Sequence, residues 1–209
     1  MQPPAIEKNE DHGKSEGIFS VFRAPITNKK PCAEISLRQA WNAIRGPRYL
    51  EVTQRLRELK GPHESEYKRL KQLLLDYVSF AGIFSRHSDD AILALSGFMC
   101  LDFDHLDNLQ AKRRKLISDP IYSPCLLFTS PGADGLKAVV RNLHLTDPYQ
   151  VAYKKTMDHF FRRYGLAADT TCSNISRACF LCHDPDAFLY EDSNLEGSEE
   201  GLDKKTKFN

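Results

Sequence analysis

The sequence has no long apolar run, and nowhere does it approach the roughly 20 consecutive apolar residues that a membrane-spanning helix needs. The segment from Met1 to Lys30 is polar and lacks the apolar core of a secretory signal. We therefore expect a cytoplasmic protein with no membrane partner. In that compartment the six cysteines should stay reduced, mostly as small core residues.

A strong net charge is also missing. The 29 Lys and Arg residues are balanced by 28 Asp and Glu residues, which leaves a formal net charge of +1. The chain therefore has no strong overall electrostatic field that would indicate a nucleic-acid or membrane partner, so any basic surface must be local. The densest candidate is the run Lys112, Arg113, Arg114 and Lys115, which could follow a nucleic-acid backbone.

The length of 209 residues fits one domain with tails. Residues 1–16 and 192–209 are polar and have little to bury, so we expect both to be disordered. The domain itself is then expected to span residues 17–191.

Between the tails, apolar periodicity predicts an α+β fold. Ile18 to Phe22 is a short β-prone run, and Ser36 with Gln39 forms a capping-box pattern that opens an N-terminal helical extension. The second half then predicts a strand, a helix, two strands, a helix and a last strand, at residues 97–104, 106–117, 125–129, 136–143, 148–164 and 178–183. That order is typical of a split βαβ, RRM-like, antiparallel-rich sheet packed by helices.

Two carboxylates close the most apolar of these strands. Residues two apart in a strand point to the same side, so Asp102 and Asp104 should project together at the rim of the sheet. Ionised carboxylates are costly to bury unless a positive group binds them, and oxygen ligands of this kind suit Mg²⁺ or Mn²⁺. The alternative is an ordinary acidic pair that opens the following turn.

A second candidate element is the turn from Ser130 to Gly135. Its glycines let an anion approach the backbone N–H groups closely. Lys137 and Arg141 share one face of the strand that follows and could hold a triphosphate there. The alternative is a routine hairpin turn with two solvated cations.

A third carboxylate could come from either side of the last strand, where Asp169 precedes it and Asp184 follows. Asp184 and Asp186 also suit a simple turn. Cys179, Cys182 and His183 match the spacing of a haem attachment site, but in an extended strand residues three apart face opposite sides. Core cysteines are the better interpretation, with a zinc site that also uses Cys172 as the alternative.

Taken in order, four segments resemble the N-terminal domain of virulence-associated E-type (VirE-like) primase-helicase proteins of bacterial mobile elements. That family in turn looks like a branch of the archaeo-eukaryotic primase (PrimPol) superfamily. The matching segments lie at residues 77–86, 95–104, 130–137 and 174–188, with the sequences YVSFAGIFSR, LSGFMCLDFD, SPGADGLK and NISRACFLCHDPDAF.

The resemblance implies a set of site residues. Asp102, Asp104 and Asp169 would hold two divalent metal ions, with Asp184 as the fallback for the third ligand. Ser130, Gly135, Lys137 and Arg141 would contact a triphosphate, and Arg86 and Arg177 would contact phosphate or primer. The implied activity is nucleotidyl transfer from nucleoside triphosphates on single-stranded DNA or a primed template.

Two departures from the pattern of the superfamily favour a second function. The superfamily usually has histidine where this chain has Lys137, and lysine cannot shuttle a proton near neutral pH as imidazole does. The sequence also lacks the Gly-x-x-x-x-Gly-Lys-Ser/Thr loop of an ATPase, so a helicase would have to be a separate polypeptide or region. The alternative function is a catalytically inactive PrimPol-like module that binds nucleic acid or a partner.

Overall fold

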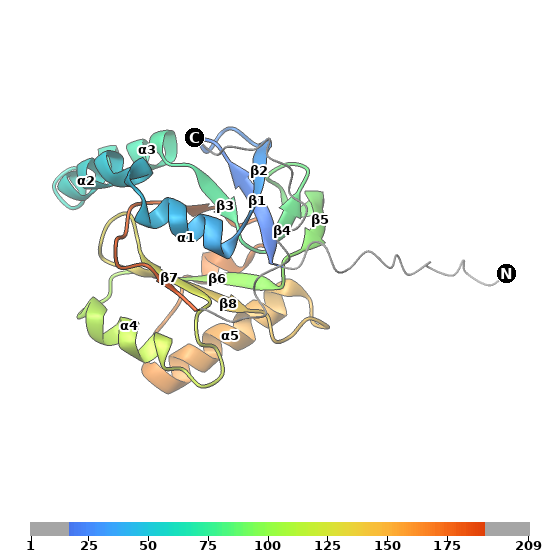
Figure 1. The fold of residues 1–209 in the computed structure, drawn as a ribbon. Coiled ribbons are helices and arrows are strands. Elements are labelled where there is room, and N and C mark those ends of the chain that lie inside the picture. The colour runs from blue at the N-terminus through green and yellow to red at the C-terminus, as the bar shows by residue number, and fades with distance from the viewer. Residues whose placement is uncertain (1–16, 191–209) are drawn as a thin grey trace.

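The computed structural model describes residues 17–190, which form a mixed α+β fold as predicted (Figure 1). The two predicted tails lie outside the described residues. Within the described part, strands gather into two four-stranded sheets and a separate two-stranded hairpin. No helix in this part is both long and apolar enough to cross a bilayer.

The first sheet has the strand order β2-β1-β3-β9. Its strands are β1 (Ile18–Phe22), β2 (Pro31–Ser36), β3 (Tyr77–Ser79) and β9 (Cys179–Phe180). Between β2 and β3 come α1 (Leu37–Arg45), a 3₁₀ turn (Pro47–Tyr49), α2 (Leu50–Leu59) and α3 (Glu64–Leu74). The strand predicted at β1 is confirmed. The N-terminal half is nevertheless more than a helical extension, because it supplies three strands of a sheet.

The second sheet has the order β10-β7-β8-β6, with antiparallel neighbours throughout. Its strands are β6 (Phe98–Phe103), β7 (Leu126–Thr129), β8 (Leu136–Arg141) and β10 (Phe188–Leu189). The helix α4 (Leu109–Ile117) follows β6, and α5 (Tyr149–Tyr164) follows β8. The hairpin consists of β4 (Gly82–Phe84) and β5 (Ile92–Leu95), joined through a 3₁₀ turn at Asp89–Ala91.

The single RRM-like sheet that we predicted is not what forms. β6 and β7 do flank β8, but the strand expected at residues 178–183 shrinks to β9, which pairs with β3 of the first sheet. The segment after β9 leaves the first sheet, and β10 then pairs with β7. β6 is consequently an edge strand rather than a central one, although Leu101 and Phe103 within it are fully buried.

Two hydrophobic clusters hold the two sheets and the helices together in layers. One joins Phe19 and Val21 of β1 to Phe128 and Val139 of the second sheet, and it includes core residues of α1, α2 and α3. The other packs the opposite face of the second sheet against α4 and α5, where the ring centroids of Phe160 and Phe103 lie 5.6 Å apart. Figure 1 shows α4 and α5 below the second sheet, with the first sheet and α1–α3 above it. Because side chains alternate along a strand, Asp102 and Lys137 face the first sheet and the α2–α3 hairpin.

Local signals set the helix ends. The capping box that opens α1 is confirmed, since Ser36 N–H donates to Gln39 Oε1 at 2.9 Å and Gln39 N–H donates to Ser36 Oγ at 3.4 Å. Gly165 ends α5 with a φ of +65°, the left-handed conformation that glycine adopts most easily. Asp147, which immediately precedes the helix expected at residues 148–164, does not cap α5. Pro148 occupies the N-cap position, and Asp147 forms an ion pair with Lys155 at 2.7 Å.

Candidate functional site

The centre of the candidate site is a buried ion pair between two facing strands. Asp102 of β6 lies opposite Lys137 of β8 in the antiparallel register, and Lys137 Nζ donates a hydrogen bond to Asp102 Oδ2. Burial alone would lower the pKa of Lys137, but the adjacent Asp102 carboxylate raises it well above its ordinary value. The other carboxylate oxygen, Asp102 Oδ1, is buried and has no hydrogen-bond partner within the described residues.

The second carboxylate stands just beyond the end of β6. Burial raises the pKa of Asp104 above its ordinary value, and the negative charge of Asp102 raises it further. Gly135 packs directly against this position: a Cβ added there would lie 2.5 Å from Phe103 O and 3.2 Å from Asp104 Oδ1. Only glycine therefore lets the turn approach so closely. A divalent cation at this point would satisfy the unpaired oxygen and stabilise the ionised form of Asp104.

The turn from Ser130 to Gly135 packs against the α2–α3 hairpin. Its own hydrogen bonds use two of the amides that we expected to face a phosphate, because Ser130 N–H donates to Gly135 O and Ala133 N–H donates to Ser130 O. Lys60, which follows α2, lies 3.4 Å from Asp134 Oδ2. The ammonium group of Lys137, rather than the turn amides, is thus the main donor on this side of the site.

Sequence reasoning missed Lys71, a half-buried residue of α3. Burial lowers its pKa, and the positive charge of Lys137 lowers it further, whereas Asp102 and Asp104 act in the opposite direction. Its Nζ lies 5.3 Å from the centroid of the Tyr67 ring. The ammonium groups of Lys71 and Lys137 therefore lie near the carboxylates of Asp102 and Asp104. We call the place where these four side chains meet the corner. The spacing of Lys71, four residues after the buried Tyr67, places it on the packed side of α3, but only the tertiary fold brings it near β6.

Asp169 also reaches this corner, by its backbone. Its N–H donates to Asp102 O at 2.9 Å, along the free edge of β6. Its carboxylate is held differently: Oδ2 lies 3.5 Å from Arg177 Nη2 and accepts a hydrogen bond from Cys172 Sγ at 3.3 Å. The structure thus brings Asp169 and Arg177 together as an ion pair, which differs from the metal-binding and phosphate-binding roles that the resemblance implied for them.

These contacts decide which kind of metal site the residues fit. Within residues 17–190, no group of three or more His, Cys, Asp or Glu side chains could hold an ion. The Asp102 and Asp104 pair with its unpaired Oδ1 instead fits Mg²⁺ or Mn²⁺ bound by two carboxylates and completed by substrate phosphates, a common arrangement for Mg²⁺. A cage built from Asp102, Asp104 and Asp169 is not formed.

Two predicted phosphate-binding residues lie outside the corner. Arg141 is opposite Phe98, four residues along β8 from Lys137, which is about 13 Å at 3.3 Å per residue. Arg86 forms an exposed ion pair with Asp90 at 2.5 Å, beside the β4–β5 hairpin. Neither is part of the site around Asp102.

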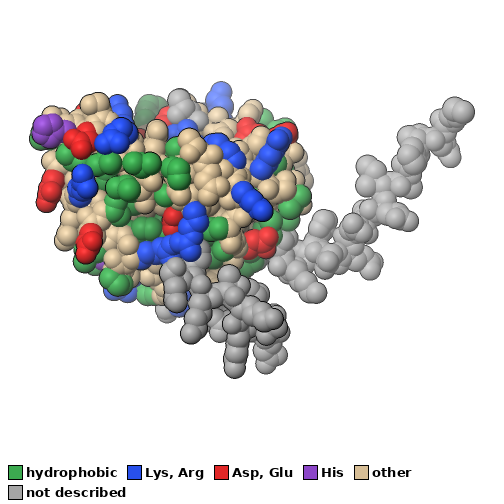
Figure 2. Space-filling view, turned by 90° about the horizontal axis from the view of Figure 1, so that it is seen from above, with side chains coloured by type: hydrophobic (Ala, Val, Ile, Leu, Met, Phe, Trp, Pro, Cys, Tyr) green, Lys and Arg blue, Asp and Glu red, His purple; other side chains and the backbone are tan. Residues whose placement is uncertain are grey.

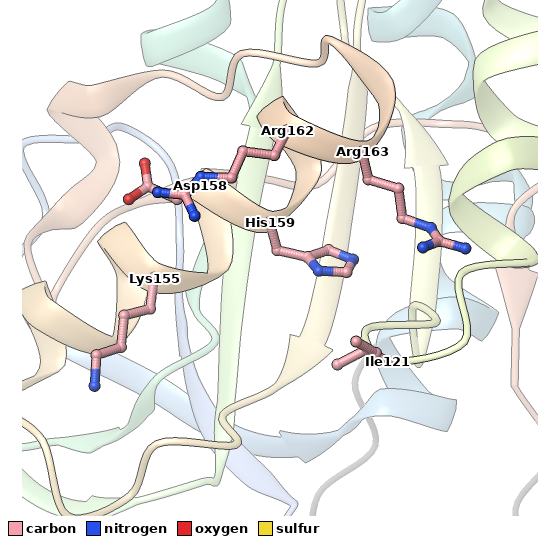
Figure 3. Close-up of a pocket in the computed structure, with 6 residues that line it drawn as sticks. All are labelled: Ile121, Lys155, Asp158, His159, Arg162 and Arg163. Carbon is pink, nitrogen blue, oxygen red and sulfur yellow. The ribbon is translucent and has the colours of Figure 1, made fainter.

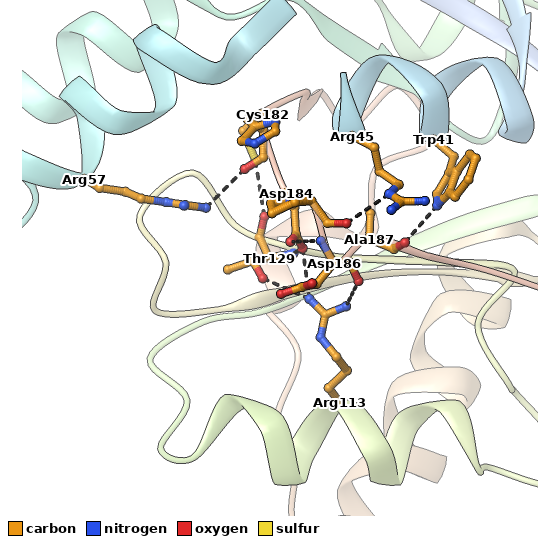
Figure 4. A network of polar contacts seen from close by, with 11 residues as sticks. Trp41, Arg45, Arg57, Arg113, Thr129, Cys182, Asp184, Asp186 and Ala187 are labelled. Atoms are coloured by element: carbon orange, nitrogen blue, oxygen red, sulfur yellow. Dashed lines mark hydrogen bonds and ion pairs between the residues drawn. The ribbon is translucent and has the colours of Figure 1, made fainter. Parts of the chain in front are cut away.

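The basic run on α4 is corrected at Arg113, which is buried and cannot follow a nucleic-acid backbone. Its guanidinium donates to Asp184 Oδ2 at 2.9 Å, to Thr129 Oγ1 at 3.0 Å and to Asp186 O at 2.7 Å (Figure 4). Lys112 is partly covered and lies 3.5 Å from Asp107 Oδ1. Arg114 and Lys115 remain exposed.

The same network excludes Asp184 as a metal ligand. Its carboxylate also accepts the N–H of Thr129 and of Asp186, so it is fully used as an anchor for the C-terminal segment. Around it, Trp41 Nε1 donates to Ala187 O and Arg45 Nε donates to Pro185 O (Figure 4). The turn interpretation of Asp184 and Asp186 is the correct one.

The cysteines near the site are core residues, as expected. None of the six, all of which lie within residues 17–190, forms a disulfide bond, and Cys179 and Cys182 are buried. Cys179 Sγ lies 3.8 Å from Cys100 Sγ, and Cys100 shares a face of β6 with Asp102, two residues further along the strand. Cys182 Sγ donates to Thr129 O, so the haem and zinc spacings have no structural counterpart among the described residues.

Comparison with known proteins identifies the family of this chain. No curated protein and no solved structure matches the chain significantly. Residues 69–189, more than half of the chain, match the family described as BT4734-like, N-terminal domain. The matched region contains the whole second sheet, Lys71 and every predicted site residue. The chain therefore belongs to the BT4734-like N-terminal domain family.

Proposed function

We propose that this domain catalyses template-directed, metal-dependent nucleotidyl transfer, in the manner of PrimPol-type primases and DNA polymerases, during replication of a mobile genetic element. The observation that supports the proposal is that three segments of the chain meet at one place. Asp102, Lys137 and Asp169 come from three separate segments and meet at one corner, through the Lys137–Asp102 ion pair and the Asp169–Asp102 backbone hydrogen bond.

The substrate that fits this corner is a nucleoside triphosphate. Lys137 and Lys71 present two ammonium groups to the same space, and each would be stabilised by a phosphate oxygen. On binding, Lys137 would exchange part of its contact with Asp102 for the triphosphate. That exchange would free Asp102 at the moment when the substrate arrives.

Asp102 and Asp104 would hold Mg²⁺ or Mn²⁺ together with the triphosphate. When bound, such an ion activates the attacking 3′-hydroxyl and stabilises the leaving pyrophosphate. Asp169 is then a positioning residue: its N–H fixes the edge of β6, and its carboxylate is neutralised by Arg177. The partners of this activity are single-stranded DNA or a primed template and, for strand separation, a separate helicase. A cytoplasmic location is consistent with these substrates.

Primer extension tests the proposal. The protein is incubated with a primed single-stranded template, nucleoside triphosphates and Mn²⁺ or Mg²⁺. Extension is expected from the wild type and should fall at least 100-fold in Asp102→Asn/Asp104→Asn, because the metal-binding charges are removed. Asp107→Asn is the matched control, since its carboxylate is 90% exposed and lies outside the corner. Equal extension by the double variant would refute the proposal.

A second candidate is a PrimPol-like binding module without turnover. The ion pairs Lys137–Asp102 and Arg177–Asp169 favour it, because both neutralise carboxylates that a polymerase would give to metal ions. Template binding that persists in Asp102→Asn/Asp104→Asn, with no extension by the wild type under either metal, would establish this module.

A further inference from the structure

The outer face of α5 carries a basic surface that the candidate site does not use. A hollow of about 550 Å³ lies along it, lined by Ile121, Lys155, Asp158, His159, Arg162 and Arg163 (Figure 3). The inner face of α5 packs on the side of the second sheet that faces away from Asp102 and Lys137. This surface is therefore separated from the candidate site by the sheet.

Helical spacing brings the cations of α5 to one side. Lys155, His159, Arg162 and Arg163 stand at positions i, i+4, i+7 and i+8, which share one helix face. Counting Lys154 as well, this stretch carries four Lys or Arg residues against Asp158, a balance of +3 in a chain whose formal net charge is only +1. The surface is a local concentration of positive charge.

A buried carboxylate holds part of this surface in place. Asp119 Oδ2 contacts His159 Nε2 at 2.8 Å and accepts a hydrogen bond from Tyr164 OH at 2.8 Å, and Arg163 Nε lies 3.6 Å away. Burial acts to raise the pKa of Asp119, but hydrogen bonds from the Tyr122 N–H and from His159 lower it overall. The ionised carboxylate therefore fixes the orientation of two basic side chains.

Two cations on the exposed side of α5 remain available to a ligand. Lys155 pairs with Asp147, and Arg163 lies near Asp119, so part of the positive charge is already compensated. Arg162 and Lys154 are exposed and form no ion pair within residues 17–190. These two side chains are the groups that an anionic ligand would engage first.

An exposed aromatic ring accompanies the charge. Phe161, next to Arg162, is 60% exposed, which is unusual for a phenylalanine in a packed domain. Surfaces that bind single-stranded nucleic acid combine cations for the phosphates with aromatic rings on which bases stack. A ligand that is recognised by its charge alone would engage the cations and leave this ring unused.

We infer that the outer face of α5 binds single-stranded nucleic acid, with backbone phosphates on Lys154 and Arg162 and a base stacked on Phe161. This inference extends the proposed function, from which it takes its ligand class. It gives the domain a second contact with the strand, on the far side of the second sheet from Asp102. A strand held there is kept near the domain independently of the reacting end.

Fluorescence anisotropy with a labelled oligothymidylate tests the inference on the full chain. Lys154→Ala/Arg162→Ala should raise the Kd about tenfold or more, and the slope of log K against log salt should become shallower by about 1.4, which is 0.7 for each lost phosphate contact. Phe161→Ala should also raise the Kd but leave the salt slope unchanged, because stacking releases no counterions. Lys68→Ala/Arg69→Ala on α3 is the matched control and should bind like the wild type.

An unchanged Kd in Lys154→Ala/Arg162→Ala would overturn the inference, as would an equal loss in the α3 control. Equal effects of the α5 variants on binding to anionic phospholipid vesicles would also overturn it, since the face would then recognise charge alone. The outcome is separable from the proposed function. Asp102→Asn/Asp104→Asn should abolish extension and leave oligonucleotide binding at α5 intact, whereas the α5 variants should weaken binding even if no extension is ever observed.

Discussion

Lys137 on β8 donates its side-chain hydrogen bond to Asp102, the residue directly opposite it on β6. The pair lies on the buried face of the sheet, where each charge is stable only because the other is present. An ammonium group thus occupies one carboxylate oxygen, while Asp102 Oδ1 stays without a hydrogen-bond partner in the described part of the chain. This relationship links the stability of the fold to the chemistry proposed for the site.

Breaking the pair should destabilise the protein. Lys137→Met leaves an uncompensated buried carboxylate and is expected to lower the free energy of unfolding by about 3–5 kcal/mol, measured by urea denaturation. Lys137→Met/Asp102→Leu should recover most of that loss, because both charges are then absent. A double variant as unstable as the single one would show that the pair is not the source of the effect.

Lys71 should contribute to nucleotide binding more than to folding. Lys71→Met is expected to weaken triphosphate binding about tenfold or more, as measured by calorimetric titration, because a charged hydrogen bond to phosphate is lost. Lys68→Met, on the exposed side of the same helix, is the control and should leave the affinity unchanged.

The pH dependence of that affinity follows from the lowered pKa of Lys71. A phosphate binds the protonated amine, so wild-type affinity should fall as the pH rises through the lowered pKa, below the ordinary value of 10.5. Lys71→Met should lack this decline. A wild-type affinity that stayed flat across the alkaline range would contradict the role given to Lys71.

Arg113 should behave as a structural residue. Arg113→Met is expected to cost about 3–5 kcal/mol of stability, because Asp184 is left buried without its partner. Oligonucleotide affinity of the protein that remains folded should be unchanged. If Arg113→Met lost nucleic-acid binding but kept its normal stability, Arg113 would belong to the nucleic-acid-binding surface instead.

The stability that Asp184 provides should also depend on pH. Burial acts to raise the pKa of Asp184, but the Thr129 N–H and Arg113 lower it overall, so the folded state favours the ionised form. This contribution is present above the unfolded value near 3.8 and is lost as the pH falls through the lowered pKa. The difference in stability between the wild type and Asp184→Asn should therefore shrink in acid, measured by urea denaturation at several pH values.

Gly135 should be intolerant of a side chain. Gly135→Ala places a Cβ 2.5 Å from the backbone oxygen of Phe103, which cannot move aside easily, so we expect a loss of about 1–3 kcal/mol together with reduced extension. Gly165→Ala is the control. Its Cβ meets nothing within 4 Å, and its φ of +65° costs stability without affecting extension.

The sequence predicts the parts of this molecule that local pattern determines. The apolar run ending in Asp102 and Asp104 is β6 within one residue at each end. The capping box of α1 lies where it was expected, and the helix expected at residues 148–164 is α5 within one residue. Partners across the sheet are different. No local pattern shows that Lys137 faces Asp102, because the pairing depends on the register of two strands separated by α4 and β7.

The wrong predictions also have physical causes. β9 is only two residues long, which is too short to show an alternation of apolar and polar residues. Its pairing with the first sheet could therefore not be predicted from Cys179 and its neighbours. The burial of Arg113 could have been predicted from its spacing. Leu109, Arg113 and Leu116 follow at i, i+4 and i+7, which places the arginine on the packed face of α4. Its position in a run of four basic residues concealed that spacing.

The most direct test of the proposed site is an electron paramagnetic resonance titration of Mn²⁺ with and without a nucleoside triphosphate. The account predicts weak binding of Mn²⁺ alone, tight binding when the triphosphate is present, loss of that tight binding in Asp102→Asn/Asp104→Asn, and its retention in Asp169→Asn. Tight binding that survives in Asp102→Asn/Asp104→Asn, after correction for Mn²⁺ bound by free nucleotide, would contradict the assignment of these two carboxylates.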